Sequence, residues 1–294
     1  MAIGSGEQTH QQRRAVAAEP VLTGSDGPGD AHLLAPDEPR PFELHNDSGS
    51  ARVLLVCDHA SRRIPNRLEN LGLDELALRR HIACDIGAGE VTRRLSRMLD
   101  APALLATYSR LVVDCNRHLD DPTAFLAVSD GEFVPGNHNI SLEEKERRAR
   151  AIFHPYHAGI DARLARFVES DVIPALIAIH SFTPIFNGAS RPWQIGVLWD
   201  TDPRIPVPLM DRLGRIPGIV VGDNEPYSGK APADYTIDHH AEPAGYPHVS
   251  IEIRQDLISS PEGADRWSRI LGGVLAEILM DDDLYRLSDV GPST

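Results

Sequence analysis

Short apolar runs alternate along the chain with stretches that mix apolar and charged residues. The run Val53–Cys57 is followed abruptly by polar residues, and the runs Ala175–Ile179 and His248–Ile251 end in the same way. An uninterrupted apolar run of this length is typical of a strand buried on both faces, as in a parallel sheet covered by helices. Shorter runs predict further strands at Ala103–Ala106, Leu111–Val113, Gln194–Trp199 and Gly218–Gly222.

Apolar residues recur at helical spacing between these runs. Ser141 and Glu144 form a capping box at the start of the longest such stretch, and Pro155 predicts a kink or a break within it. His157 is interpreted either as a satisfied histidine on the face of this helix or as a residue of a cleft. The polar stretch Asp120–Ile140 has the length of a lid or binding loop. The predicted helices are Leu73–Ile82, Glu90–Leu99, Glu143–Phe167, Pro208–Leu213 and Ala264–Met280.

The alternation of strands and helices predicts one α/β domain with a mixed, largely parallel central sheet, over residues 45–282. Residues 1–44 are rich in glycine and proline and are expected to form a disordered tail, and residues 283–294 an acidic one. We find neither the apolar segment of a signal peptide nor a run near the roughly 20 residues that span a membrane. A cytoplasmic protein is therefore expected.

Charge and cysteine content narrow the possible partners. The formal net charge of −14 at pH 7 argues against binding to nucleic acid or to an anionic membrane surface. An anionic substrate would need a local cluster of arginines to overcome this field. The three cysteines, Cys57, Cys84 and Cys115, form no paired framework and are expected to be reduced, as in the cytoplasm.

Three of the apolar runs lead into residues that can bind a metal or move a proton. These residues are His59, His180 and Glu252. Ligands in open α/β sheets collect at the carboxyl ends of the strands, so we expect the three side chains to meet there. A catalytic zinc ion takes three protein ligands, commonly two histidines and a carboxylate, and leaves a fourth position for water. A nearby glutamate then serves as the general base, which is the role predicted for Glu252.

The third metal ligand is open at this point. Short zinc motifs place a carboxylate three residues after the first histidine, but Arg62 stands at that position. Asp85, in a glycine-containing turn, is the first choice, although an aspartate there also suits a helix cap. Asp58 is the second choice for this ligand. Cys57 is a further possibility, but it is more simply interpreted as a buried thiol of the core. None of the common nucleophile, phosphate-loop or dinucleotide motifs follows a predicted strand.

A candidate seat for a substrate carboxylate lies around the predicted strand Leu111–Val113. Arg110 and Arg117 flank this strand, and Asn116 is next to the second arginine. An arginine can meet a carboxylate with two parallel charge-assisted hydrogen bonds, and an asparagine amide can hold a further oxygen. The three residues therefore predict binding of a small anionic molecule.

Taken as an ordered series, six segments resemble the N-formylglutamate amidohydrolase family. They are CDHAS at 57–61, ACDIGA at 83–88, SRLVVDCNR at 109–117, HSFTP at 180–184, NEPYSG at 224–229 and IEIR at 251–254. The resemblance implies a fold similar to that of the zinc carboxypeptidases and aspartoacylases, a three-layer α/β sandwich. It also implies one Zn²⁺ per chain, bound by His59, His180 and, by the aspartate that it matches, Asp85.

The resemblance assigns further roles. Glu252 is implied to be the general base, Arg110 is implied to act in catalysis and in substrate binding, and a group of pocket residues is implied beside it: Asn116, Arg117, Tyr227, Ser228 and His240. The function implied is hydrolysis of the amide bond of a small N-acyl amino acid that carries a carboxylate. Two alternatives stay open, a non-catalytic binder of acyl amino acids and a zinc peptidase of small substrates. Ala60-Ser61 and Arg254-Gln255 depart from the family's usual residues and indicate a divergent branch.

Overall fold

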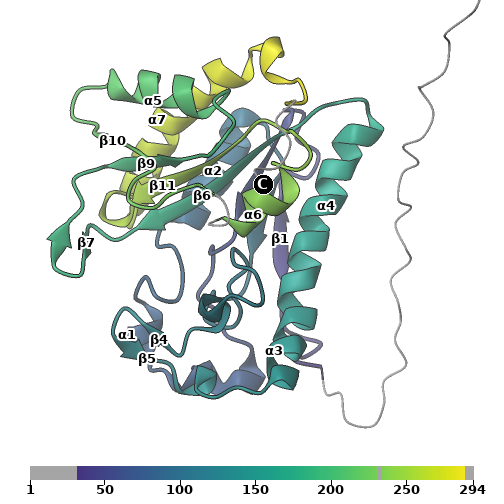
Figure 1. Cartoon of the computed structure of the whole chain (residues 1–294), viewed down its shortest axis with the longest axis vertical. Coiled ribbons are helices and arrows are strands. Elements are labelled where there is room, and N and C mark those ends of the chain that lie inside the picture. The colour runs from purple at the N-terminus through teal and green to yellow at the C-terminus, as the bar shows by residue number, and fades with distance from the viewer. Residues whose placement is uncertain (1–31, 231–233, 289–294) are drawn as a thin grey trace, which may run out of the picture. The chain divides into compact units, whose positions relative to one another are not determined.

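The computed structural model describes residues 32–230 and 234–288. Residues 33–294 form one compact unit, and a sheet of seven strands lies at its centre (Figure 1). The remaining unit of the chain, residues 1–32, lies almost wholly outside the described residues. The strand order is β1, β3, β2, β6, β11, β9 and β10. Their bounds in that order are Phe42–His45, Ala103–Ala106, Val53–Cys57, Ala175–Phe182, His248–Arg254, Ile195–Leu198 and Val221–Asp223.

The sheet is mixed but largely parallel, as predicted. Strands β3, β2, β6 and β11 are parallel neighbours, and β9 and β10 form a further parallel pair. Only β1 against β3 and β9 against β11 are antiparallel in this sheet. Two short hairpins lie outside it, β4 (Val128–Ser129) with β5 (Glu132–Phe133) and β7 (Ile185–Phe186) with β8 (Ala189–Ser190).

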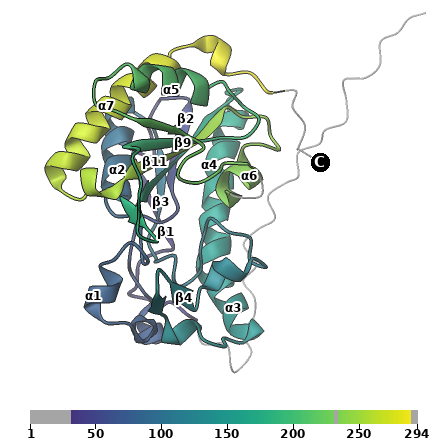
Figure 2. The same ribbon diagram turned by 60° about the vertical axis from the view of Figure 1, so that its left-hand side comes forward.

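Helices cover both faces of the sheet, which gives three layers (Figure 2). One face packs against α2 (Ala88–Leu99), α5 (Pro206–Gly214) and α7 (Pro261–Leu279), and the other against α4 (His154–Glu169) and α6 (Tyr235–His240). Because side chains alternate along a strand, Leu54 and Val56 of β2 join the α4 side, while Val53 and Leu55 join the α2 side. The unbroken apolar run of β2 follows from this burial on both faces. Among the described helices, none is long and apolar enough to cross a membrane.

Two predicted helices differ in the structure. The stretch from residue 73 to 82 forms only the short helix α1 (Glu75–Leu78), capped by Asp74. The predicted long helix consists of α3 (Leu142–Arg148), a π-helical segment (Ala149–Phe153) and α4. Pro155 has no backbone N–H and cannot make the regular hydrogen bond of an α-helix. The predicted interruption is observed as the π-helical segment that ends just before it.

The predicted strand Leu111–Val113 is wrong. These residues are buried but lie in a turn-containing loop, where the Val112 N–H donates to the Ser109 carbonyl and the carbonyls of Leu111 and Val112 accept from the side chains of Asn137 and Arg148. The flanking arginines therefore lie on a loop and not at the two ends of a strand. The strand expected at Gly218–Gly222 is also displaced, and its observed counterpart is β10.

The folded domain extends further at both ends than predicted. Leu33 is buried and β1 pairs with β3, so residues 33–44 belong to the domain and not to the expected tail. At the other end Leu284 and Tyr285 are buried, and the Arg52 guanidinium lies 3.7 Å from the centre of the Tyr285 ring. Apolar side chains thus hold residues that were expected to form an acidic tail. Residues 1–31 and 289–294 of the expected tails lie outside the described residues.

The long connection between residues 111 and 141 is fastened to α3 by one buried arginine. The Arg148 guanidinium donates to Asn137 Oδ1 at 2.6 Å and to the carbonyl oxygens of Gly136 at 3.0 Å and Val112 at 3.3 Å. It also donates to Glu144 Oε1 at 2.8 Å. These bonds order a loop that carries the candidate substrate-binding residues.

Candidate metal and substrate site

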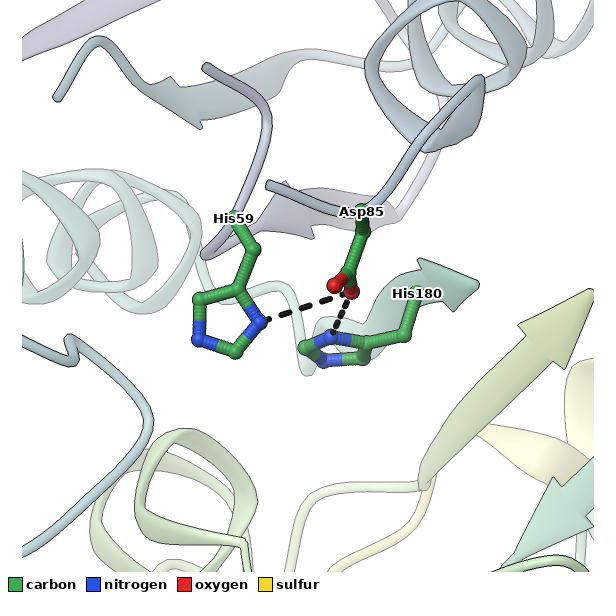
Figure 3. Close-up of side chains that lie close together, drawn as sticks. All are labelled: His59, Asp85 and His180. Carbon is green, nitrogen blue, oxygen red and sulfur yellow. Dashed lines mark hydrogen bonds and ion pairs between the residues drawn. The ribbon is translucent and has the colours of Figure 1, made fainter. Parts of the chain in front are cut away.

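Three neighbouring parallel strands bring the predicted histidines and glutamate together at their carboxyl ends. His180 lies in β6, and Glu252 of β11 is its register partner, so both side chains emerge on one face of the sheet. His59 follows β2, the other neighbour of β6. The ring centres of His59 and His180 are 5.2 Å apart (Figure 3). This separation is within the roughly 8 Å that a shared ion with bonds of about 2 Å requires.

Asp85 faces both imidazole rings from the turn before α2 (Figure 3). Its Oδ2 lies 3.0 Å from His180 Nδ1 and 3.4 Å from His59 Nδ1, and the Ser181 N–H donates to the same oxygen at 3.2 Å. The Asp85 N–H donates to the His59 carbonyl at 3.0 Å, which fixes the turn to β2. Gly87 completes this turn with φ of +83°, and a Cβ there would lie 2.3 Å from a carbonyl oxygen of Ile258.

A second carboxylate holds each histidine from behind. His59 Nε2 is 2.7 Å from Asp114 Oδ1, and His180 Nε2 is 3.2 Å from Asp58 Oδ2. His59 Nε2 donates its proton to Asp114, because an ionised carboxylate can only accept, whereas His180 Nε2 meets Asp58 in an ion-pair contact without hydrogen-bond geometry. The Nδ1 atoms of both rings point towards the Asp85 oxygen. Two ring nitrogens and a carboxylate oxygen that face one another need positive charge between them, supplied by protons or by a metal ion.

The surrounding charges favour such positive charge. Burial lowers the pKa of His180, but its contacts with Asp58 and Asp85 outweigh burial and raise that pKa well above the ordinary value. For His59, burial and Arg110 lower the pKa, whereas Asp114 and Asp85 raise it, and the net shift is upward. Burial favours the neutral form of Asp85, yet the two imidazoles hold its pKa well below the usual range. The aspartates therefore favour positive charge on or between the two imidazoles.

Glu252 has a different environment from these aspartates. Burial raises its pKa to about 7, and its side chain is only slightly exposed. Its Oε2 has no hydrogen-bond partner within residues 32–230 and 234–288. A buried carboxylate that titrates near neutral pH and faces a cavity with an unused oxygen is suited to accept and return a proton.

The predicted anion-binding residues border the same cavity. The Arg110 Nε and Nη2 atoms donate to Asp114 Oδ2 at 3.1 and 2.7 Å, and Nη1 lies 3.4 Å from Asp85 Oδ1. Asn116 Oδ1 accepts the Thr236 N–H at 2.9 Å, which ties the loop to α6. Arg117 Nη1 donates to the Asn116 carbonyl at 2.8 Å. Arg110 is thus held beside Asp85 and Asp114, and both Arg110 and Arg117 line the cavity.

The cavity has a volume of about 450 Å³ and unites nine of the ten predicted site residues. They are His59, Asp85, Arg110, Asn116, Arg117, His180, Tyr227, Ser228 and Glu252. The tenth, His240, does not line it. His240 lies between α6 and α4, where it contacts Asp161 and His157. Its place at the end of α6, with the ring turned towards α4, could not be deduced from the spacing of the polar residues.

The structure distinguishes between Asp85, Asp58 and Cys57, the three candidates for the third metal ligand. Asp58 Oδ1 accepts hydrogen bonds from the hydroxyls of Thr236 at 2.7 Å and Tyr156 at 2.8 Å. Asp58 Oδ2 lies 3.2 Å from His180 Nε2, the ring nitrogen that does not face Asp85. Cys57 is fully buried in the core on the α2 side, and burial raises the pKa of its thiol to about 12. Asp85 is therefore the acidic side chain that both Nδ1 atoms face.

Sequence reasoning missed several residues of the site. His81 lines the cavity with its Nε2 at 3.9 Å from Asp85 Oδ1, and burial lowers its pKa to about 4. Its position four residues before Asp85 was a usable signal. Asp114 follows an apolar run directly, as Asp58 does, and the same pattern could have marked it. The remaining lining residues are Asp121, Ser181, Leu198 and Asp234.

The fold and the site define an α/β protein with a buried His–Asp–His cluster that could hold a metal ion, a buried glutamate and adjacent arginines. Residues 51–259 match the family model described as N-formylglutamate amidohydrolase. Because this match covers well over half of the chain, the chain belongs to the N-formylglutamate amidohydrolase family.

A curated relative carries a name from this family, and two solved structures share the fold. The chain is 26% identical over 177 residues to an N-formylglutamate deformylase of Pseudomonas putida, a match that covers 54% of this chain and 65% of that protein. The crystal structure of a gene product of Agrobacterium tumefaciens is 32% identical with a TM-score of 0.82, over 84% of this chain and 98% of that one. An N-formylglutamate amidohydrolase of Ralstonia eutropha shares the fold at 18% identity and a TM-score of 0.59, over 82% of this chain and 97% of that one.

Proposed function

We propose that the protein is a zinc-dependent amidohydrolase that removes the acyl group from a small N-acyl amino acid. The observation that carries this proposal is the paired orientation of His59 and His180. Each ring directs Nδ1 towards Asp85 and places Nε2 against a buried aspartate behind it, through a hydrogen bond from His59 to Asp114 and an ion-pair contact of 3.2 Å between His180 and Asp58. Histidines that bind catalytic metals are commonly oriented by such carboxylates.

The residues present fit a zinc ion. His59, Asp85 and His180 are two nitrogen ligands and one oxygen ligand, a set found in catalytic zinc sites, and they leave a position open towards the cavity. A bound zinc ion would polarise the scissile carbonyl and make a water molecule acidic enough to attack near neutral pH. Asp58 and Asp114 keep the ring protons on the far nitrogens, so that both ligand atoms stay available.

Glu252 is the proposed general base. It takes the proton of the attacking water as the new carbon–oxygen bond forms, and it gives this proton to the amine nitrogen as the carbon–nitrogen bond breaks. Its pKa of about 7 suits both directions of transfer. Arg110, held by Asp85 and Asp114, directs its positive charge towards the carbonyl oxygen, where negative charge develops.

The substrate is proposed to be a small N-acyl amino acid with a side-chain or main-chain carboxylate. Arg117 and Asn116 line the cavity and are the proposed contacts for this carboxylate, with Tyr227 and Ser228 on the opposite loop. The Pseudomonas relative is named for deformylation of N-formylglutamate, which makes this compound the first substrate to test. The cavity of about 450 Å³ has room for a molecule of that size.

The test combines metal content with hydrolysis of N-formylglutamate. The protein is stripped with a chelator, reloaded with zinc and compared with Glu252→Gln and with Glu169→Gln, a control on an exposed position of α4. We expect loss of hydrolysis on stripping, recovery with zinc, and a loss of at least about 100-fold in Glu252→Gln with unchanged metal content. Full activity of the stripped protein or of Glu252→Gln contradicts the proposal. Tight binding of N-formylglutamate without turnover favours the non-catalytic binder.

A further inference from the structure

A second cluster of histidine and aspartate lies where α6 packs beside α4 (Figures 1 and 2). Asp161 belongs to α4, and His239 and His240 end α6. Each of the three offers one ligand atom, and these atoms all lie within 4.8 Å of one another. None of the three residues lines the cavity described above.

A buried chain of hydrogen bonds fixes the proton positions in this cluster. His157 Nε2 lies 2.9 Å from the Cys115 carbonyl, which can only accept, so this nitrogen carries the proton. In the neutral ring Nδ1 is then the acceptor. His240 Nε2, at 2.9 Å from that Nδ1, must therefore be the donor. In a neutral His240 ring the free electron pair is then on Nδ1.

This electron pair points at another acceptor. His240 Nδ1 is 2.7 Å from Asp161 Oδ1, and the His240 side chain is almost fully buried while that of Asp161 is exposed. A lone-pair nitrogen and a carboxylate oxygen in contact require a proton or a metal ion between them. The pairs at His59 and His180 show the same arrangement with Asp85.

His239 supplies the third ligand atom. Its ring is stacked on Tyr235 with ring centres 5.0 Å apart and an angle of 11° between the planes, which limits its rotation. One of its ring nitrogens lies within 4.8 Å of the ligand atoms offered by Asp161 and His240. Two imidazoles and a carboxylate, partly exposed to solvent, form a site that an ion can enter from outside.

We propose that Asp161, His239 and His240 bind a second divalent metal ion of the zinc, cobalt or nickel type. Imidazole nitrogen prefers these ions to magnesium and calcium, which favour oxygen ligands. The described part of the chain offers three ligands here, so water would complete the coordination. The chain through His157 to the Cys115 carbonyl orients His240 in the way that outer hydrogen bonds orient ligands in known metal sites.

The test is metal stoichiometry on the full chain without an affinity tag. Chelator-stripped protein is dialysed against Zn²⁺, and bound metal is measured for wild type, Asp161→Asn, His239→Ala and Asp85→Asn. Asp161 and His239 are exposed, so their substitution leaves the fold intact. We expect about two equivalents in wild type and one in each variant, with Asp85→Asn keeping the site on α4 and α6. His154→Ala, an exposed histidine on the same helix, is the matched control and keeps two.

The outcomes separate this inference from the proposed function. If Asp161→Asn and His239→Ala bind as much zinc as wild type, the second site does not exist. If wild type binds one equivalent that Asp85→Asn removes, the second site is likewise overturned and the hydrolase centre stands. If the single equivalent is removed by Asp161→Asn and kept by Asp85→Asn, the second site is supported and the zinc of the hydrolase centre is contradicted.

Discussion

Asp58→Asn tests how the protein holds His180 for the metal. Asp58 Oδ1 accepts hydroxyls from Tyr156 at 2.8 Å and Thr236 at 2.7 Å, and Oδ2 lies 3.2 Å from His180 Nε2. An asparagine keeps these hydroxyl bonds when its carbonyl oxygen takes the Oδ1 position. Its amide NH₂ then faces the His180 Nε2–H, and two donors meet.

The ring of His180 responds by moving its proton to Nδ1, where it bonds to Asp85. That nitrogen then has no free electron pair with which to bind the metal ion. Outer-sphere substitutions of this kind cost typically about 10 to 100-fold in metal affinity. This range corresponds to about 1.4 to 2.8 kcal/mol of binding free energy. We therefore expect Asp58→Asn to bind zinc 10 to 100-fold more weakly than wild type.

The assay is competition for zinc with a chromophoric chelator at fixed pH and ionic strength. Tyr156→Phe is the matched control, because it removes one hydroxyl from Asp58 Oδ1 and leaves the Oδ2 contact with His180. The control is expected to change affinity by less than about threefold. Zinc affinity in Asp58→Asn equal to that of wild type refutes this account of His180, whatever the effect on stability.

Three further predictions follow from named contacts. Glu252 must be ionised to accept a proton, and burial raises its pKa to about 7, so kcat/KM should rise between pH 5 and 7.5. A flat pH profile over that range contradicts its role as the base. Arg117→Ala should raise KM for N-formylglutamate about 10 to 100-fold by removing a charged donor from the cavity, with a smaller change in kcat, and an unchanged KM places the carboxylate elsewhere. Arg148→Met leaves the carboxylate of Glu144 and the oxygens of Asn137 without their buried partner, so denaturant unfolding should show a loss of about 3 to 5 kcal/mol, whereas a loss below about 1 kcal/mol contradicts its anchoring role.

The sheet and the centre of the site could be predicted because both depend on short-range patterns. An apolar run such as β2 marks a strand buried on both faces, and the first polar residue after it marks the edge where ligands collect. This reasoning identified His59, His180 and Glu252 as residues at one edge of the sheet. The structure brings them together there, with Asp85 between the two rings.

Other features depend on contacts between distant segments. The supporting role of Asp58 requires Thr236, which is 178 residues away in sequence, and no local pattern indicates that contact. Leu111–Val113 has the composition of a strand, but its carbonyl groups accept hydrogen bonds from the distant side chains of Asn137 and Arg148, and it lies in a loop. The ring of His240 is turned towards Asp161 by the packing of α6 against α4, which places it outside the predicted pocket.

The central claim is that His59, Asp85 and His180 share one metal ion. The most direct measurement is anomalous diffraction at the zinc edge from crystals of the zinc-loaded protein. We predict a peak about 2.0 to 2.2 Å from the Nδ1 atoms of His59 and His180 and from a carboxylate oxygen of Asp85. Crystals that contain zinc but show no peak among these three side chains contradict the claim.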